Sequence, residues 1–249
     1  MLLYDPLASF RTDGDGLVAA IERAGMDVEV PWCPGWKTRD LLYHVGEVWH
    51  FWGHVVDLGV TDPAQLGAYV GPPVPPDDEL LAWARRQRRS LWRVLGWGRP
   101  DRPLWTWANT PGSVGWVRRR MAQETAVHRW DAEAAAGRAW GIDPLVAADG
   151  IEEFLQHFSA GPSADAAPVG GTVHLHCTDE GLPEHAGEWI VHEFTPDGAR
   201  FDRVHAKGDA AVRGRASDLL LWLWRRPAPV EILGDAGVAA RFVAREKLD

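Results

Sequence analysis

Two side chains with metal-binding chemistry, Glu124 and His128, are four residues apart in a segment whose apolar residues repeat with a helical period. Residues spaced i and i+4 lie on one face of a helix, so the carboxylate and the imidazole point the same way. That face is otherwise the apolar face of a helix over 113–137. A buried carboxylate and imidazole both need partners, and a divalent metal ion suits both. The same spacing also fits a hydrogen-bonded Glu–His pair without a metal.

A third donor is expected from a helix over 38–58, where His44 borders the apolar stripe. His50 and His54 lie farther round, toward the polar face. Two histidines and one carboxylate leave positions for water or substrate, which is typical of a catalytic zinc site. We therefore predict that His44, Glu124 and His128 bind the metal and act in catalysis through it. The stripe on this helix consists of Leu41, Val45, Val48, Trp52 and Val55.

Asp131 lies at the edge of the same face as Glu124 and His128. A carboxylate at this position can orient a metal-bound histidine through its other ring nitrogen. It can equally take part in local packing, and the sequence does not separate the two roles.

The elements that must position these residues are helices in the first two thirds of the chain. The periodicity predicts helices over 5–25, 38–58, 77–96, 113–137 and 144–160, separated by Pro/Gly segments. This arrangement predicts an up-and-down four-helix bundle. The small, Pro/Gly-rich segment 160–171 is typical of a linker. We therefore place one domain at 1–160 and a second at 168–249.

After residue 168 the pattern changes to short alternating runs, which predict strands over 172–178, 188–194, 199–205, 210–214 and 230–233. Helices are expected over 217–226 and 236–246. The fold class is thus α followed by α+β: a bundle, then a small antiparallel sheet with helices on one side. His174 and His176 share one strand face, but the sequence identifies no third ligand, so an exposed or interdomain face is the preferred interpretation.

Composition excludes several classes of protein. The 35 acidic and 26 basic residues give a net charge of -9, which disfavours a nucleic-acid partner. Two distant cysteines, Cys33 and Cys177, provide no disulfide scaffold or zinc knuckle. The N-terminal residues lack the pattern of a signal peptide, and no apolar run approaches the roughly 18 residues of a membrane span. We expect a cytoplasmic protein, a monomer or homodimer, that does not bind membranes.

Several segments together resemble a known family. In the first part these are Cys33-Pro34-Gly35-Trp36, Thr38-Arg39-Asp40-Leu41, His44-Val45-Gly46 and the run from Glu124 to Glu133, ETAVHRWDAE. In the second part they are His176-Cys177-Thr178-Asp179, Val212-Arg213-Gly214, the run from Ser217 to Leu223, and Gly234-Asp235. The chain resembles the mycothiol-dependent maleylpyruvate isomerase family over nearly its whole length.

The resemblance implies a DinB-like bundle that holds a divalent metal, usually zinc, followed by a domain similar to sterol carrier protein type 2. It places the metal ligands at His44, Glu124 and His128. It also implies mycothiol or a similar low-molecular-weight thiol as cosubstrate, since zinc stabilises thiolate over thiol. Addition of the thiolate to a cis double bond, rotation and elimination would then isomerise a small-molecule substrate.

The resemblance also gives Arg226 as a residue that binds an anionic group of thiol or substrate. Arg225 departs from the family pattern, which usually has Gly there, and this puts the position of Arg226 in doubt. A solvated helix end is the alternative interpretation.

The chain is rich in tryptophan, with 15 against 7 phenylalanines and 3 tyrosines. Core packing explains many of them, but several, with Trp52 and Trp130 as candidates, can form a substrate wall. Such a wall favours a bulkier apolar or aromatic electrophile, and hence a thiol S-transferase. The sequence also leaves open a non-catalytic small-molecule binding protein and an interaction or regulatory role.

Overall fold

The computed structural model describes residues 2–108, 110–159, 168–183, 185–195 and 198–244, which form two compact units. One unit comprises residues 4–140, and the main part of the other begins at Gly141. The predicted domain boundary lies at 160–168, and residues 160–167 of that predicted linker lie outside the described residues. The difference concerns the helix that starts at Pro144, whose buried face packs on the second unit's own helix and strand.

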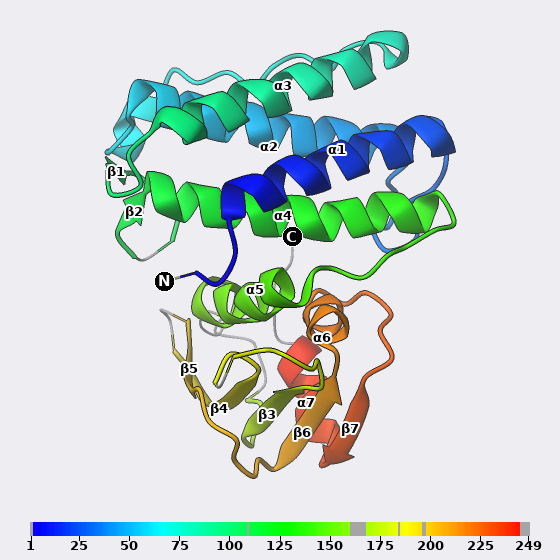
Figure 1. Cartoon of the computed structure of the whole chain (residues 1–249), viewed down its shortest axis with the longest axis vertical. Coiled ribbons are helices and arrows are strands. Elements are labelled where there is room, and N and C mark those ends of the chain that lie inside the picture. The colour runs from blue at the N-terminus through cyan, green and yellow to red at the C-terminus, as the bar shows by residue number, and fades with distance from the viewer. Residues whose placement is uncertain (1, 109, 160–167, 184, 196–197, 245–249) are drawn as a thin grey trace. The chain divides into compact units, whose positions relative to one another are not determined.

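The first unit is built on four long helices (Figure 1). They are α1 (Pro6–Ala24), α2 (Thr38–Leu58), α3 (Asp77–Trp97) and α4 (Val114–Ala135). A short 3-10 turn, η1 (Pro63–Leu66), and a two-stranded ribbon, β1 (Pro103–Leu104) with β2 (Gly112–Ser113), lie in the connections. Helix α1 packs along α4, and α2 packs along α3. The predicted four-helix bundle is confirmed, with helix bounds within two residues of those expected.

Local hydrogen bonds explain where the bundle helices begin and end. The Asp5 carboxylate accepts from the amides of Leu7 and Ala8 at the start of α1, and Ser113 Oγ accepts from the amide of Trp116 at the start of α4. Gly59 ends α2 in a left-handed conformation, with φ of 66°. No helix in the described part of the chain is long and apolar enough to cross a membrane.

The second unit combines a five-stranded sheet with three helices. It contains α5 (Pro144–His157), β3 (Val173–Cys177), β4 (Glu188–Thr195), β5 (Gly198–Asp202), β6 (Ala210–Gly214), α6 (Ala216–Leu223), β7 (Glu231–Gly234) and α7 (Ala236–Ala244). The strand order is β5-β4-β3-β6-β7, and all neighbours are antiparallel except β3 and β6, which are parallel. The predicted α+β class is confirmed.

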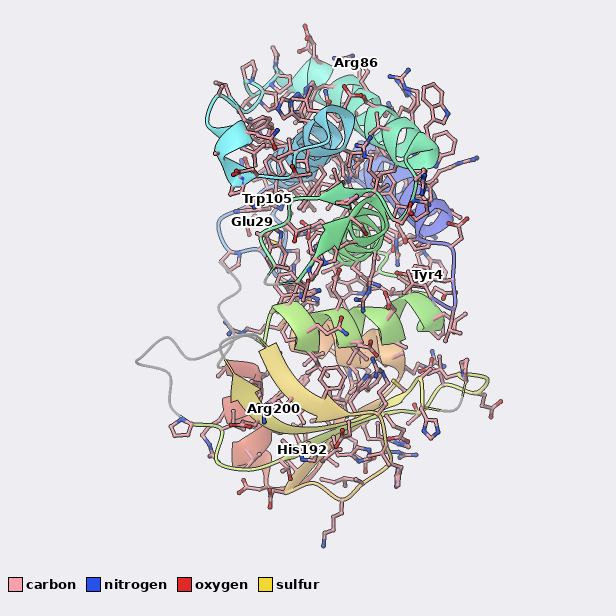
Figure 2. All side chains as sticks on the ribbon, turned by 90° about the vertical axis from the view of Figure 1, so that its left-hand side faces the viewer. Tyr4, Glu29, Arg86, Trp105, His192 and Arg200 are labelled. Atoms are coloured by element: carbon pink, nitrogen blue, oxygen red, sulfur yellow. The ribbon has the colours of Figure 1, made fainter. Side chains whose placement is uncertain are left out.

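The strands alternate as a half-buried sheet requires. Val173 and Leu175 of β3 and Trp189 of β4 are buried in the core. His174 and His176 lie on the opposite face of β3. Side chains fill both faces of the sheet in Figure 2, which labels His192 on β4 and Arg200 on β5.

Two predicted bounds in this unit are corrected. Strand β5 ends at Asp202, not at residue 205, so His205 belongs to the segment that leads to β6. Helix α6 ends at Leu223, not at residue 226, because Arg225 takes a left-handed conformation with φ of 59°. That conformation costs a non-glycine residue energy.

Candidate metal centre in the helical bundle

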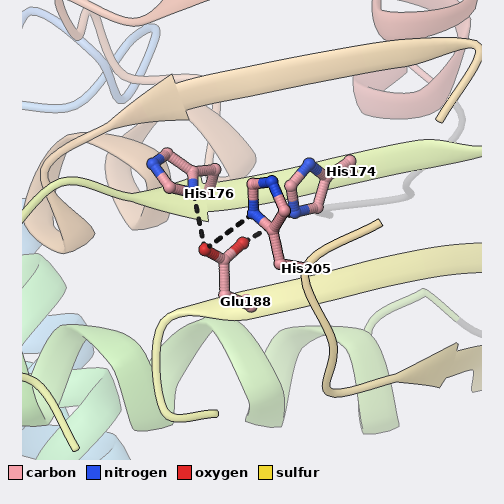
Figure 3. Close-up of side chains that lie close together, drawn as sticks. All are labelled: His174, His176, Glu188 and His205. Atoms are coloured by element: carbon pink, nitrogen blue, oxygen red, sulfur yellow. Dashed lines mark hydrogen bonds and ion pairs between the residues drawn. The ribbon is translucent and has the colours of Figure 1, made fainter. Parts of the chain in front are cut away.

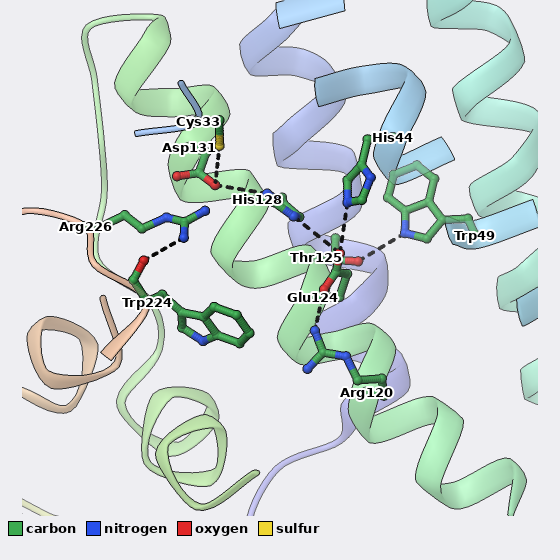
Figure 4. Close-up of polar contacts among 10 residues, drawn as sticks. All are labelled: Cys33, His44, Trp49, Arg120, Glu124, Thr125, His128, Asp131, Trp224 and Arg226. Atoms are coloured by element: carbon green, nitrogen blue, oxygen red, sulfur yellow. Dashed lines mark hydrogen bonds and ion pairs between the residues drawn. The ribbon is translucent and has the colours of Figure 1, made fainter. Parts of the chain in front are cut away.

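The structure brings together three donor atoms from two helices (Figure 4). His44 on α2 faces Glu124 and His128 on α4. The Oε1 atom of Glu124 lies 3.4 Å from Nε2 of His44 and 3.3 Å from Nε2 of His128. The two imidazole rings are 5.2 Å apart and nearly perpendicular. Both histidines therefore present Nε2 to a single carboxylate oxygen.

Glu124 is held as a carboxylate. Its other oxygen, Oε2, accepts a short hydrogen bond from the guanidinium of Arg120, one helical turn earlier. Burial favours the neutral acid, but the charges of Arg120 and His128 and the hydrogen bonds from both histidines outweigh it, and they hold the pKa of Glu124 well below its usual range. Because Arg120 occupies Oε2, the Oε1 atom is the one that faces the histidines.

Asp131 contacts the other ring nitrogen of His128. Nδ1 of His128 donates to Oδ2 of Asp131 over 2.9 Å, and the Asp131 side chain is fully buried. Burial lowers the pKa of His128, but the Glu124 carboxylate and the hydrogen bonds to Asp131 and Glu124 outweigh it and raise the pKa to about 9. The ring is thus fixed with Nε2 toward Glu124, as in carboxylate–histidine–metal triads.

The Cys33–Trp36 turn closes one side of this cluster. The amide of Trp36 donates to the carbonyl of Cys33 over 2.9 Å, and Gly35 has φ of 81°. Pro34 before that Gly completes the pattern of a type II turn. The turn places the Trp36 ring 4.9 Å from the His44 ring and Sγ of Cys33 3.8 Å from Oδ2 of Asp131.

A buried polar contact fixes α2 against α4 near the cluster. Nε1 of Trp49 donates to Oγ1 of Thr125 over 3.1 Å, and both side chains are inaccessible to solvent. Trp49 follows His44 on α2, and Thr125 follows Glu124 on α4. This contact limits sliding of one helix along the other, and so it keeps the three donor atoms in register.

Other residues predicted for substrate or thiol lie in different surroundings. Trp52 is only 4% exposed, and its ring packs on those of Trp105 and Trp116. Trp130 is 8% exposed. Arg226 belongs to the second unit, where its guanidinium donates to the carbonyl of Trp224 over 2.7 Å. The ligand-binding roles of Trp52, Trp130 and Arg226 stay predictions.

The sequence analysis missed two neighbours of the site, Arg120 and Trp36. The i, i+4 spacing of Arg120 and Glu124 on one helix was a signal for the first contact. The packing of Trp36 on His44 had no comparable signal, because it depends on how the turn lies against α2.

The donor set fits a divalent metal ion. Two atoms bound about 2.0–2.1 Å from one tetrahedral zinc ion are about 3.3–3.4 Å apart. The two nitrogen–oxygen distances, 3.4 Å and 3.3 Å, have this size, and all three donor atoms lie within 4.8 Å of one another. The side chain of His44 is 35% exposed, so an external ligand can reach the cluster.

Two family models match the chain. That of the mycothiol maleylpyruvate isomerase N-terminal domain matches residues 7–133, and that of the MDMPI C-terminal domain matches residues 146–241. No curated protein matches the chain.

Among solved structures, the chain is similar to the crystal structure of the mycothiol-dependent maleylpyruvate isomerase. The identity is 13%, 93% of each chain is covered, and the TM-score is 0.62. A crystal structure of a histidine-to-alanine mutant of mycothiol-dependent maleylpyruvate isomerase gives 12% identity, coverage of 89% of this chain and 88% of that chain, and a TM-score of 0.56. At such identities the likeness concerns the fold.

Proposed function

Because the chain belongs to the mycothiol maleylpyruvate isomerase family, we propose that it is a metal-dependent enzyme that uses mycothiol or a similar low-molecular-weight thiol. The metal, zinc in the first place, is held by His44, Glu124 and His128. The observation that supports the proposal is the convergence of these donor atoms, with both nitrogen–oxygen separations of the size found around a tetrahedral ion.

The ion, when bound, favours the thiolate form of the thiol at neutral pH. The residues of the chain prepare that site. Glu124 supplies negative charge through Oε1 while Arg120 neutralises Oε2. Asp131 holds His128 in the orientation that presents Nε2. His44, Glu124 and His128 would leave one position of a tetrahedral ion open, and the thiol sulfur could occupy it.

The reaction that we propose is cis–trans isomerisation of an electron-poor double bond. The thiolate sulfur forms a bond to one alkene carbon, and the electron pair of the double bond moves into the adjacent carbonyl group as an enolate. Rotation about the new single bond and loss of the thiolate restore the double bond in the trans form. The thiol is regenerated, and no oxidant or reductant is needed.

A second candidate is a thiol S-transferase, and the position of Trp36 favours it. Its indole ring lies 4.9 Å from the His44 ring and is only partly buried, so it offers an aromatic surface beside the donor set. A flat apolar or aromatic electrophile packs on that surface better than a small dianion does. In this case the sulfur stays attached to the product.

Thiol-dependent turnover of maleylpyruvate tests the first candidate, and turnover of aromatic electrophiles tests the second. The informative variant is His128→Ala, compared with His54→Ala on the same bundle, because the His54 ring contacts Tyr69 and lies outside the donor set. We expect His128→Ala to lose the metal ion of the bundle and turnover together, and His54→Ala to keep both. Stoichiometric metal without any thiol-dependent turnover would instead support the non-catalytic small-molecule binding protein.

The cytoplasmic location, the monomer or homodimer state and the domain bounds 1–160 and 168–249 stay predictions.

A further inference from the structure

A second group of metal-binding side chains lies on the sheet face of the second unit that carries His174 and His176 (Figure 3). His176 on β3 is directly opposite Glu188 on β4 in the antiparallel register. His174 lies two residues before His176, and so on the same face. His205 joins them from the segment between β5 and β6. The cluster therefore combines three side chains from adjacent strands with one from a loop.

The three imidazoles converge on one carboxylate. Nε2 of His174 lies 2.7 Å from Oε2 of Glu188, and Nδ1 of His176 lies 2.6 Å from Oε1. Nδ1 of His205 lies 3.2 Å from the same Oε1. The ring centroids of the histidines are 5.0 to 5.9 Å apart. All four donor atoms lie within 4.8 Å of one another.

Burial and charge suit a cation at this point. The His174 side chain is 6% exposed and that of Glu188 is 20% exposed, whereas His205 is 74% exposed. Burial raises the pKa of Glu188, but the hydrogen bonds from the three histidines outweigh it and lower the pKa. The nearest arginine in the register, Arg213 opposite His176, pairs with Glu231 at 3.1 Å. Among the described side chains, the contacts of the Glu188 carboxylate are thus with imidazoles and not with a guanidinium group.

We propose that these four side chains bind a divalent transition-metal ion, and that zinc is the ion that the donor set fits best. Four protein donors complete a tetrahedron, which is typical of a structural and not of a catalytic zinc site. Donor atoms around zinc are about 3.3 Å apart, so binding moves the histidines outward by less than about 1 Å. His205 lies on an exposed loop, and its bond to the ion attaches that loop to the sheet. This proposal does not depend on the proposed function of the bundle.

The alternative is a hydrogen-bonded cluster in which Glu188 accepts from three neutral imidazoles. A zinc titration of the full-length chain separates the two. The variant His44→Ala/His128→Ala removes the bundle donors, so that of the groups found among the described residues only the sheet cluster remains to bind zinc. His205→Ala is the informative addition, because an exposed loop side chain is replaced without disturbing the sheet.

The matched control is His192→Ala. His192 is also partly exposed, and its Nε2 lies 3.0 Å from Oδ2 of Asp202, outside the cluster. We expect one zinc per chain in the double variant. We expect its affinity to fall by more than about 100-fold on adding His205→Ala, since loss of a direct ligand exceeds the loss caused by an outer partner. With His192→Ala the affinity is unchanged.

A double variant that folds but binds no zinc, or that loses as much affinity with His192→Ala as with His205→Ala, overturns the proposal. If the double variant does not fold, the single variants His205→Ala and His176→Ala are made in the wild-type chain instead. We then expect each of them to bind one zinc ion per chain fewer than the wild-type protein. An unchanged zinc content in these two variants would equally overturn it. Loss of zinc from the bundle alone bears on the proposed function and leaves the sheet site intact.

Discussion

Replacing Asp131 by Asn tests how the bundle site positions its histidine. The substitution keeps the size of a fully buried side chain but removes the charge that Nδ1 of His128 contacts at 2.9 Å. Loss of such an outer partner typically weakens metal binding by about 10–100-fold, or roughly 1.4–2.7 kcal/mol. The same change removes two of the interactions that raise the pKa of His128 to about 9, so this pKa should fall.

Zinc affinity by chelator competition measures the first effect, and histidine NMR titration of the metal-free protein measures the second. Asp13→Asn is the control, because Asp13 is a largely buried carboxylate of the same bundle that pairs with Arg129 at 2.8 Å. We expect it to leave zinc affinity unchanged. An affinity within twofold of wild type in Asp131→Asn, with the pKa of His128 unmoved, would refute the positioning role.

Three further predictions concern pH, packing and thiol reactivity. The apparent zinc affinity of the bundle site should rise about tenfold per pH unit up to about pH 9 and then level off. The reason is that zinc binding displaces the proton that His128 holds below its pKa. Calorimetric titration with zinc across this pH range measures the change in affinity. Gly46→Ala should lower the free energy of unfolding by about 1–3 kcal/mol in urea denaturation, because the new methyl group would overlap the Trp83 ring. Cys177 should resist iodoacetamide at neutral pH in the folded protein and react after unfolding. The reason is that burial, together with the charges of Asp179 and Glu188, raises the pKa of its thiol. Mass spectrometry of the labelled peptides measures the extent of alkylation.

The proximity of His44, Glu124 and His128 was predictable from the sequence because helical spacing determines which residues share a face. Glu124 and His128 are one turn apart, and His44 borders the stripe that α2 buries. The same period gave the bounds of the four bundle helices within two residues. The hydroxyl–indole contact of Thr125 with Trp49 depends instead on the axial position of α2 against α4. No single-helix pattern contains that information.

The sheet cluster could not be predicted, because it depends on strand register. His174 and His176 were visible as a pair on one face, but Glu188 joins them only through the antiparallel pairing of β3 with β4. His205 was assigned to a strand over 199–205, whereas the strand ends at Asp202 and a loop carries the side chain to the cluster. The assignment of the helix over 144–160 to the first domain stays a prediction, since periodicity shows which face of a helix is buried but not against which partner.

The most direct test of the bundle account is the zinc-edge X-ray absorption spectrum of the protein loaded with one equivalent of zinc, before and after addition of mycothiol. His205→Ala is the chain to use, so that the sheet cluster does not compete for the ion. We expect two imidazole rings and otherwise only nitrogen or oxygen donors in the first spectrum, and one additional sulfur at about 2.3 Å in the second. A spectrum that the thiol leaves unchanged, or one that shows the same two imidazole rings in the added variant His128→Ala, would contradict the proposed site.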